Sequence, residues 1–102
     1  MDLKPGSRWK SAVCTAEFVV VRPPSAPGEL ACGGHPVVAH AATPPPGLSP
    51  SPDASAGSQA GKRYGDAETG LEVLCAKAGV GSPSLSARPL TIRDAKKLPS
   101  SD

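Results

Sequence analysis

Two short motifs in this chain of 102 residues carry side chains that could do chemistry, Cys14-x-x-Glu17 and Cys32-x-x-His35. The two-residue spacing is that of metal knuckles, because a tight turn then aims two side chains at one ion. Together, Cys14, Glu17, Cys32 and His35 would satisfy a tetrahedral Zn²⁺, and they would also hold iron with less thiolate than is usual. They form a candidate metal site for Zn or Fe.

The same cysteines allow two further interpretations. Cys14 and Cys32 could form a reversible disulfide, or both could be buried small apolar residues, as free cysteines often are. Cys75 falls at an apolar position of a strand-like segment and is predicted to be a core thiol. A nucleophile pair of either Cys14 or Cys32 with His35 lacks a recognisable oxyanion device or orienting acid. We therefore predict no catalytic residues and no enzyme.

Composition narrows the functional class. The net charge is +2, from eleven basic and nine acidic residues spread along the chain. This balance indicates no charged surface for nucleic acid or an anionic membrane. Four basic residues near the C-terminus are read as a solvated tail, with a docking patch as the alternative: Arg88, Arg93, Lys96 and Lys97. No apolar run reaches the roughly 18–20 residues of a membrane span, and the N-terminus lacks signal-peptide order. A cytoplasmic protein with free thiols is expected, and the absence of Asn suits a GC-rich bacterial genome.

The chain divides into three regions. Residues 1–42 form a first β unit, with strands expected over 9–14, 17–22, 29–32 and 36–39. Residues 43–61 are rich in Pro, Ser and Gly and are predicted to be a flexible linker. Residues 62–102 form a second β-hairpin unit with a short tail that packs on the first; its strand is expected over 71–77, its hairpin over 84–92 and a helical turn over 91–98. Asp66 and Glu68 are read as turn residues.

A weak internal repeat links the two units. A shift of 53 positions places Phe18 on Leu71, Gly28 on Gly81 and Cys32 on Leu85. The second unit would then be a degenerate copy without a site, because none of the cysteines repeats. The two units are expected to pack through apolar residues: Val20, Leu30, Val73 and Leu85.

Residues 14–38 resemble desulforedoxin and the N-terminal domain of desulfoferrodoxin. The family pattern is Cys-x-x-Cys, a valine-rich strand, a Gly-rich turn, Glu or Thr then Leu, and Cys-Cys-Gly after one residue. This chain has Cys14-x-x-Glu17, Val19-Val20-Val21, Gly28-Glu29-Leu30 and Cys32-Gly33-Gly34 in that order. Glu17 and Gly33 stand where the family has its second and fourth cysteines. The resemblance implies a small β fold, a homodimer and, with all four thiolates, one iron centre for electron transfer.

The expected fold class is therefore a small all-β domain of short antiparallel hairpins, with an internal duplication joined by the linker. The expected function is that of a non-enzymatic accessory or interaction protein built on a degenerate metal-knuckle scaffold. The alternative is a metal-binding or redox module that uses Cys14 and Cys32. Its partner would be another protein or a second copy, not a nucleic acid, a membrane or a small-molecule substrate.

Overall fold

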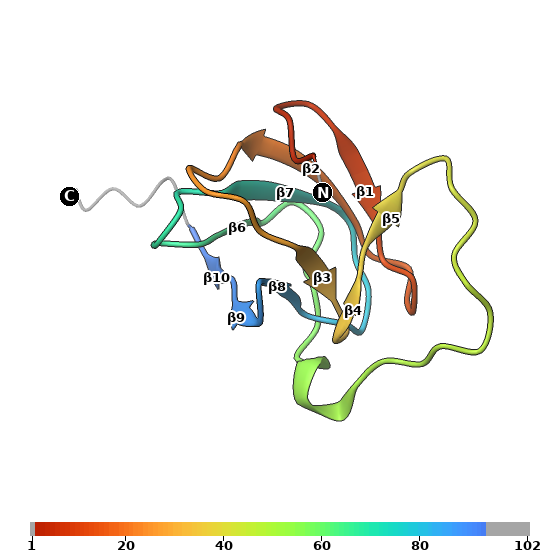
Figure 1. Cartoon of the computed structure of the whole chain (residues 1–102). Helices are drawn as coiled ribbons and strands as arrows, with labels where there is room; N and C mark the ends of the chain where they lie inside the picture. Colours follow the sequence, from red (N-terminus) through yellow and green to blue (C-terminus); the bar gives the residue numbers. More distant parts are fainter. Residues whose placement is uncertain (1, 94–102) are drawn as a thin grey trace.

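The computed structural model describes residues 2–93, and their regular structure is almost entirely β-strand (Figure 1). The strands form a six-stranded sheet in the order β10-β6-β7-β2-β1-β5 and a four-stranded sheet in the order β4-β3-β8-β9. All strand pairings within the two sheets are antiparallel. The predicted all-β class of short hairpins is confirmed. Within the same residues the structure has no helix long and apolar enough to cross a membrane.

Each half of the chain contributes strands to both sheets. The strands of the first half are β1 (Arg8–Lys10), β2 (Glu17–Arg22), β3 (Leu30–Cys32), β4 (His35–Pro36) and β5 (Val38–Ala39). Those of the second half are β6 (Arg63–Gly65), β7 (Glu72–Lys77), β8 (Pro83–Leu85), β9 (Arg88–Pro89) and β10 (Thr91–Ile92). The β-branched run of β2 favours this extended backbone, and its predicted bounds are confirmed.

The second half repeats the first in strand order and strand length, and the burial patterns of β2 and β3 recur in β7 and β8. The repeats also pair with each other, Val19 opposite Leu74 in one sheet and Ala31 opposite Ser84 in the other. These are corresponding residues, so the halves are related by an approximate two-fold axis. A common origin of the halves remains a prediction.

The 53-residue shift holds for only part of the chain. Residue 30 corresponds to 83, 53 positions later, but residues 8 and 17 correspond to 63 and 72, which lie 55 positions later. Phe18 therefore corresponds to Val73, and its expected match with Leu71 is wrong. The reason is that the turn over 23–29 is two residues longer than the turn over 78–82.

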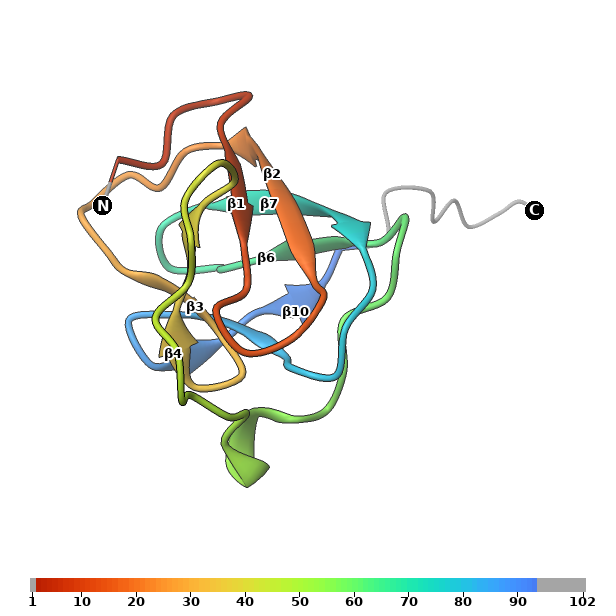
Figure 2. The ribbon, with the colours of Figure 1, turned by 90° about the vertical axis from the view of Figure 1, so that its right-hand side faces the viewer.

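The core lies between the two sheets, which Figure 2 shows with β3 and β4 below β1, β2 and β7. Val20 pairs with Val73 in the upper sheet, and Leu30 pairs with Leu85 in the lower one. All four side chains are at most 1% exposed. Complete burial of such a side chain stabilises the fold by about 1.5–3 kcal/mol before ordering costs, so these pairs hold the halves together.

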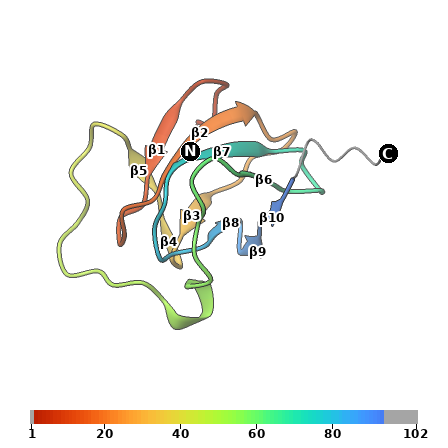
Figure 3. The same ribbon diagram turned by 180° about the vertical axis from the view of Figure 1, so that it is seen from behind.

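The segment over 43–61 runs as a long arc outside the sheets and carries one short 3-10 helix, Pro52–Ala54 (Figure 3). Its second part is tied to the fold by backbone hydrogen bonds. Ser51 N donates to Gly33 O at 2.8 Å, and Ser82 N donates to Ala54 O at 2.8 Å. Ser58 bridges to Gly79 and is only 3% exposed. Flexibility of the whole linker remains a prediction, but residues 51–58 make defined contacts.

Several predictions for single elements differ from the structure. The segment expected as one strand over 36–39 is divided into β4 and β5, which lie in different sheets. The strand expected over 9–14 ends at Lys10, because Ser11 begins a turn. Strand β6 was not expected, since Arg63 and Gly65 around Tyr64 hide the apolar alternation. Thr91–Ile92 form a strand rather than the start of a helical turn, and the rest of that predicted turn lies outside the described residues.

The β8–β9 turn holds two non-glycine residues at positive φ, Ser86 at 49° and Ala87 at 70°. The corresponding β3–β4 turn has Gly33 and Gly34 there. Because a Cβ atom is disfavoured in this conformation, Ala87→Gly should stabilise the protein by about 0.5–1 kcal/mol in urea unfolding. Ala26→Gly, in an exposed turn without positive φ, should destabilise it. If Ala87→Gly instead lowers the free energy of unfolding, the backbone at Ala87 is not strained.

Candidate functional site

The fold brings two of the predicted ligands, Cys14 and Cys32, into contact. Cys14 lies in the turn between β1 and β2, and Cys32 is the last residue of β3. Their Sγ atoms are 4.0 Å apart, and both are free thiols. A disulfide bond is about 2.0 Å long, so the two sulfurs touch without being bonded. The contact lies between the β1–β2 turn of the six-stranded sheet and strand β3 of the four-stranded sheet.

The turn that presents Cys14 is built on Ser11. Ser11 N donates to Ala16 O at 2.9 Å and closes the turn. Ser11 Oγ accepts the N–H groups of Val13 and Cys14, each at 3.1 Å. These two bonds satisfy backbone donors that the turn leaves unpaired. Ser11 is 3% exposed, so its hydroxyl is shielded from water.

Two glycines of the turn over 78–82 lie directly against the sulfurs. A Cβ atom on Gly79 would be 2.7 Å from Cys14 Sγ, and one on Gly81 would be 3.1 Å from Cys32 Sγ. Any larger residue would push the turn away from the thiols, because the backbone itself covers them. Ser58 completes this side, since its hydroxyl donates to Gly81 O at 2.6 Å.

The two thiols differ in their electrostatics. Burial would raise the pKa of Cys14, but hydrogen bonds from the Ser11 hydroxyl and from the backbone of Ala16 and Gly81 outweigh it and lower the pKa. Cys32 is fully buried, and burial together with the negative charge of Cys14 raises its pKa to about 12. The partly exposed Cys14 is therefore the sulfur that ionises first.

The other two predicted ligands do not complete a metal site. Glu17 lies on β2, where its carboxylate forms an ion pair with Lys77 Nζ at 3.7 Å and contacts His40 Nε2 at 3.3 Å. Among residues 2–93, no three side chains of His, Cys, Asp or Glu gather as metal ligands, so Glu17 and His35 do not join the cysteines as a four-ligand set. The chain also lacks the four thiolates of the resembled iron centre, and the residues present do not fit it.

The third cysteine lies apart as a core thiol. Cys75 is fully buried on β7, and its thiol donates to Lys77 O at 3.2 Å. Burial raises its pKa, and the charge of Cys14 adds to that effect. This is the environment of an inert structural cysteine, as its apolar position in the sequence predicts.

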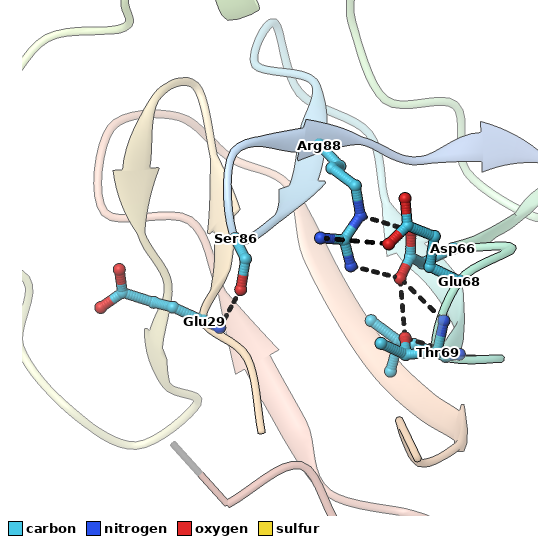
Figure 4. Close-up of polar contacts among 7 residues, drawn as sticks. Glu29, Asp66, Glu68, Thr69, Ser86 and Arg88 are labelled. Atoms are coloured by element: carbon cyan, nitrogen blue, oxygen red, sulfur yellow. Dashed lines mark hydrogen bonds and ion pairs between the residues drawn. The ribbon is translucent and has the colours of Figure 1, made fainter. Parts of the chain in front are cut away.

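A partly buried ion pair that the sequence reasoning missed lies in the second half (Figure 4). Arg88 Nη2 donates to Asp66 Oδ2 at 2.8 Å, and Arg88 Nε donates to Asp66 Oδ1 at 3.2 Å. Asp66 also accepts the backbone and hydroxyl groups of Thr69. The Arg88 hydrogen bonds lead the causes that hold the pKa of Asp66 far below its usual range. Arg88 thus belongs to the fold, and its reading as part of a solvated tail is wrong.

Comparison with protein-family models, with curated proteins and with solved structures found no match to this chain.

Proposed function

We propose that this protein is a small redox module, an accessory protein rather than an enzyme, in which Cys14 and Cys32 cycle between a dithiol and a disulfide. The contact of 4.0 Å between the two Sγ atoms supports this proposal most directly. To form the disulfide, the two sulfurs must approach each other by about 2 Å. A movement of the Cys14 side chain in its turn can supply this approach. Because Cys14 is partly exposed and Cys32 is buried, Cys14 reacts first and Cys32 second.

The oxidant in this proposal is a disulfide, RSSR, of a small thiol or of a partner protein. The Cys14 thiolate attacks one sulfur of RSSR, a mixed disulfide forms, and RS⁻ leaves. Cys32 then loses its proton and attacks Cys14 Sγ, which releases the second RS⁻. Two electrons pass from the thiol pair to RSSR, and both leaving thiolates take up protons.

The high pKa of Cys32 does not block the second step. Part of its rise comes from the negative charge of Cys14, and that charge is gone once Cys14 is in a neutral mixed disulfide. Cys32 therefore ionises more readily at the moment when it must attack. The same charge keeps Cys32 protonated while Cys14 is free, so a single thiolate faces the oxidant.

Equilibration in glutathione redox buffers tests the proposal. Between about −300 and −120 mV the wild type should acquire one intramolecular disulfide, seen by peptide mass spectrometry between Cys14 and Cys32. Cys32→Ser should stop as a mixed disulfide at Cys14, and Cys14→Ser should not react. Cys75→Ser is the matched control and should behave as the wild type, because its thiol is buried elsewhere.

Two results would contradict this function. One is a pair that stays reduced across the whole range of potentials. The other is purified protein with stoichiometric zinc or iron that disappears in Cys14→Ala, which would restore the metal-binding alternative.

A further inference from the structure

Ser11 is a buried polar residue whose hydroxyl group has a fixed environment. A serine hydroxyl has one proton to donate and can accept two hydrogen bonds. Both acceptor positions of Ser11 Oγ are taken by Val13 N and Cys14 N at 3.1 Å. Its proton is the only part left to find a partner, and the hydroxyl lies against Cys14, whose sulfur is 4.0 Å from Cys32 Sγ.

The second half of the chain has the same turn with a different residue in this position. Asp66 corresponds to Ser11: Asp66 N donates to Leu71 O at 2.9 Å, and Asp66 Oδ2 accepts Thr69 N at 3.1 Å. The turn thus requires an acceptor here, and a carboxylate serves as well as a hydroxyl. Holding the turn together does not explain why the first half carries a serine.

The chemical group of the acceptor distinguishes the two turns. Thr69, which corresponds to Cys14, donates its hydroxyl proton to Asp66 at 2.7 Å. At the thiol pair the acceptor is a hydroxyl instead of a carboxylate, so Ser11 is the residue of the turn that has a proton to offer, and it holds Cys14 through the Cys14 N–H group. A carboxylate in this place would have no proton to give and would repel a thiolate.

We propose that Ser11 is the positioning residue of the dithiol: its hydroxyl, held by the N–H groups of Val13 and Cys14, donates its proton to the sulfur pair and makes Cys14 the attacking sulfur. This inference rests on the proposed function and adds the residue that directs it. Ser11 acts through Cys14 and does not itself exchange electrons.

The second half supplies the test variant, Ser11→Asp. The carboxylate keeps both backbone hydrogen bonds, as Asp66 shows for one of them, but it removes the donor and adds a negative charge. The pH profile of iodoacetamide alkylation at Cys14 should move to higher pH, with about a tenfold lower rate at neutral pH for each unit that the pKa rises. Ser11→Thr keeps the hydroxyl and should restore the wild-type profile.

Ser25→Asp is the matched charge control, because Ser25 is exposed in the turn over 23–29 and the net charge changes equally. If Ser11→Asp does not fold, as judged by circular dichroism, Ser11→Ala and Ser11→Thr carry the same comparison. A folded Ser11→Asp or Ser11→Ala protein with the wild-type profile would overturn the inference while leaving disulfide formation in the wild type untouched. A wild type that forms no Cys14–Cys32 disulfide would refute the proposed function instead.

Discussion

Gly79→Ala is expected to destabilise the protein by about 1–3 kcal/mol and to make Cys14 less reactive. The added methyl group would lie 2.5 Å from Ala16 N and 2.7 Å from Cys14 Sγ, closer than real Cβ contacts. Because Ala16 N is backbone, the obstruction is relieved only when the turns over 11–16 and 78–82 move apart. The movement would take the N–H group of Gly81 away from the Cys14 sulfur and raise the pKa of that thiol.

Urea unfolding and the pH profile of Cys14 alkylation measure the two effects together. The neighbouring variant Val80→Ala is the control, since Val80 is 59% exposed and its truncation should change stability by no more than about 0.5 kcal/mol. A Gly79→Ala protein with wild-type stability and reactivity would show that the two turns are not packed as closely as the structure has them.

Asp66→Asn should destabilise the protein by about 1–3 kcal/mol at neutral pH, because the amide loses the charge-assisted hydrogen bonds to Arg88. The Asp66 side chain is 5% exposed, whereas the guanidinium of Arg88 is 38% exposed, so solvent screening places the expected loss in the lower part of this range. Glu68→Gln is the matched control: Glu68 lies 3.8 Å from the same guanidinium but is 71% exposed, and such surface pairs contribute little.

The pH dependence of the Asp66 effect has a definite sign. The pKa of Asp66 is lowered in the folded protein, so its stabilising contribution is complete above the unfolded-state pKa of about 4. The contribution is lost as the pH falls below that value toward the folded-state pKa. Urea unfolding at stepped pH should therefore show the gap between wild type and Asp66→Asn closing below about pH 4. A gap that is constant down to pH 2 would contradict the ion pair.

Local sequence signals were sufficient for much of the fold. The valine run identified β2 to the residue, and the turn residues Gly33 and Gly34 correctly separated β3 from β4. Strand β6 was missed because only Tyr64 among its three residues is apolar. The sequence comparison found the repeat with a single shift of 53 positions, although β1 and β2 require a shift of 55. The turn over 23–29 is longer than the turn over 78–82, and a comparison without gaps cannot detect such a difference in length.

Only part of the candidate site could be predicted in the same way. The two motifs Cys14-x-x-Glu17 and Cys32-x-x-His35 assigned both cysteines to one candidate site, and the fold places their sulfurs in contact. The same spacing argument was misleading for Glu17, whose place on β2 directs it to His40 and Lys77. The Asp66–Arg88 pair had no such signal, because Asp66 follows β6 and Arg88 begins β9, and only the fold brings the two residues together.

The sequence alone determined the fold class and the residue types that are available. It predicts a β-rich chain with two thiols, Cys14 and Cys32, at the ends of predicted strands. What the thiols can do was decided by tertiary structure. Gly79, Gly81 and Ser58 are distant in sequence from Cys14 and Cys32, yet their backbone and hydroxyl groups surround the sulfurs. Burial and hydrogen bonding set the reactivity of a thiol, and both depend on neighbours that only the folded chain assembles.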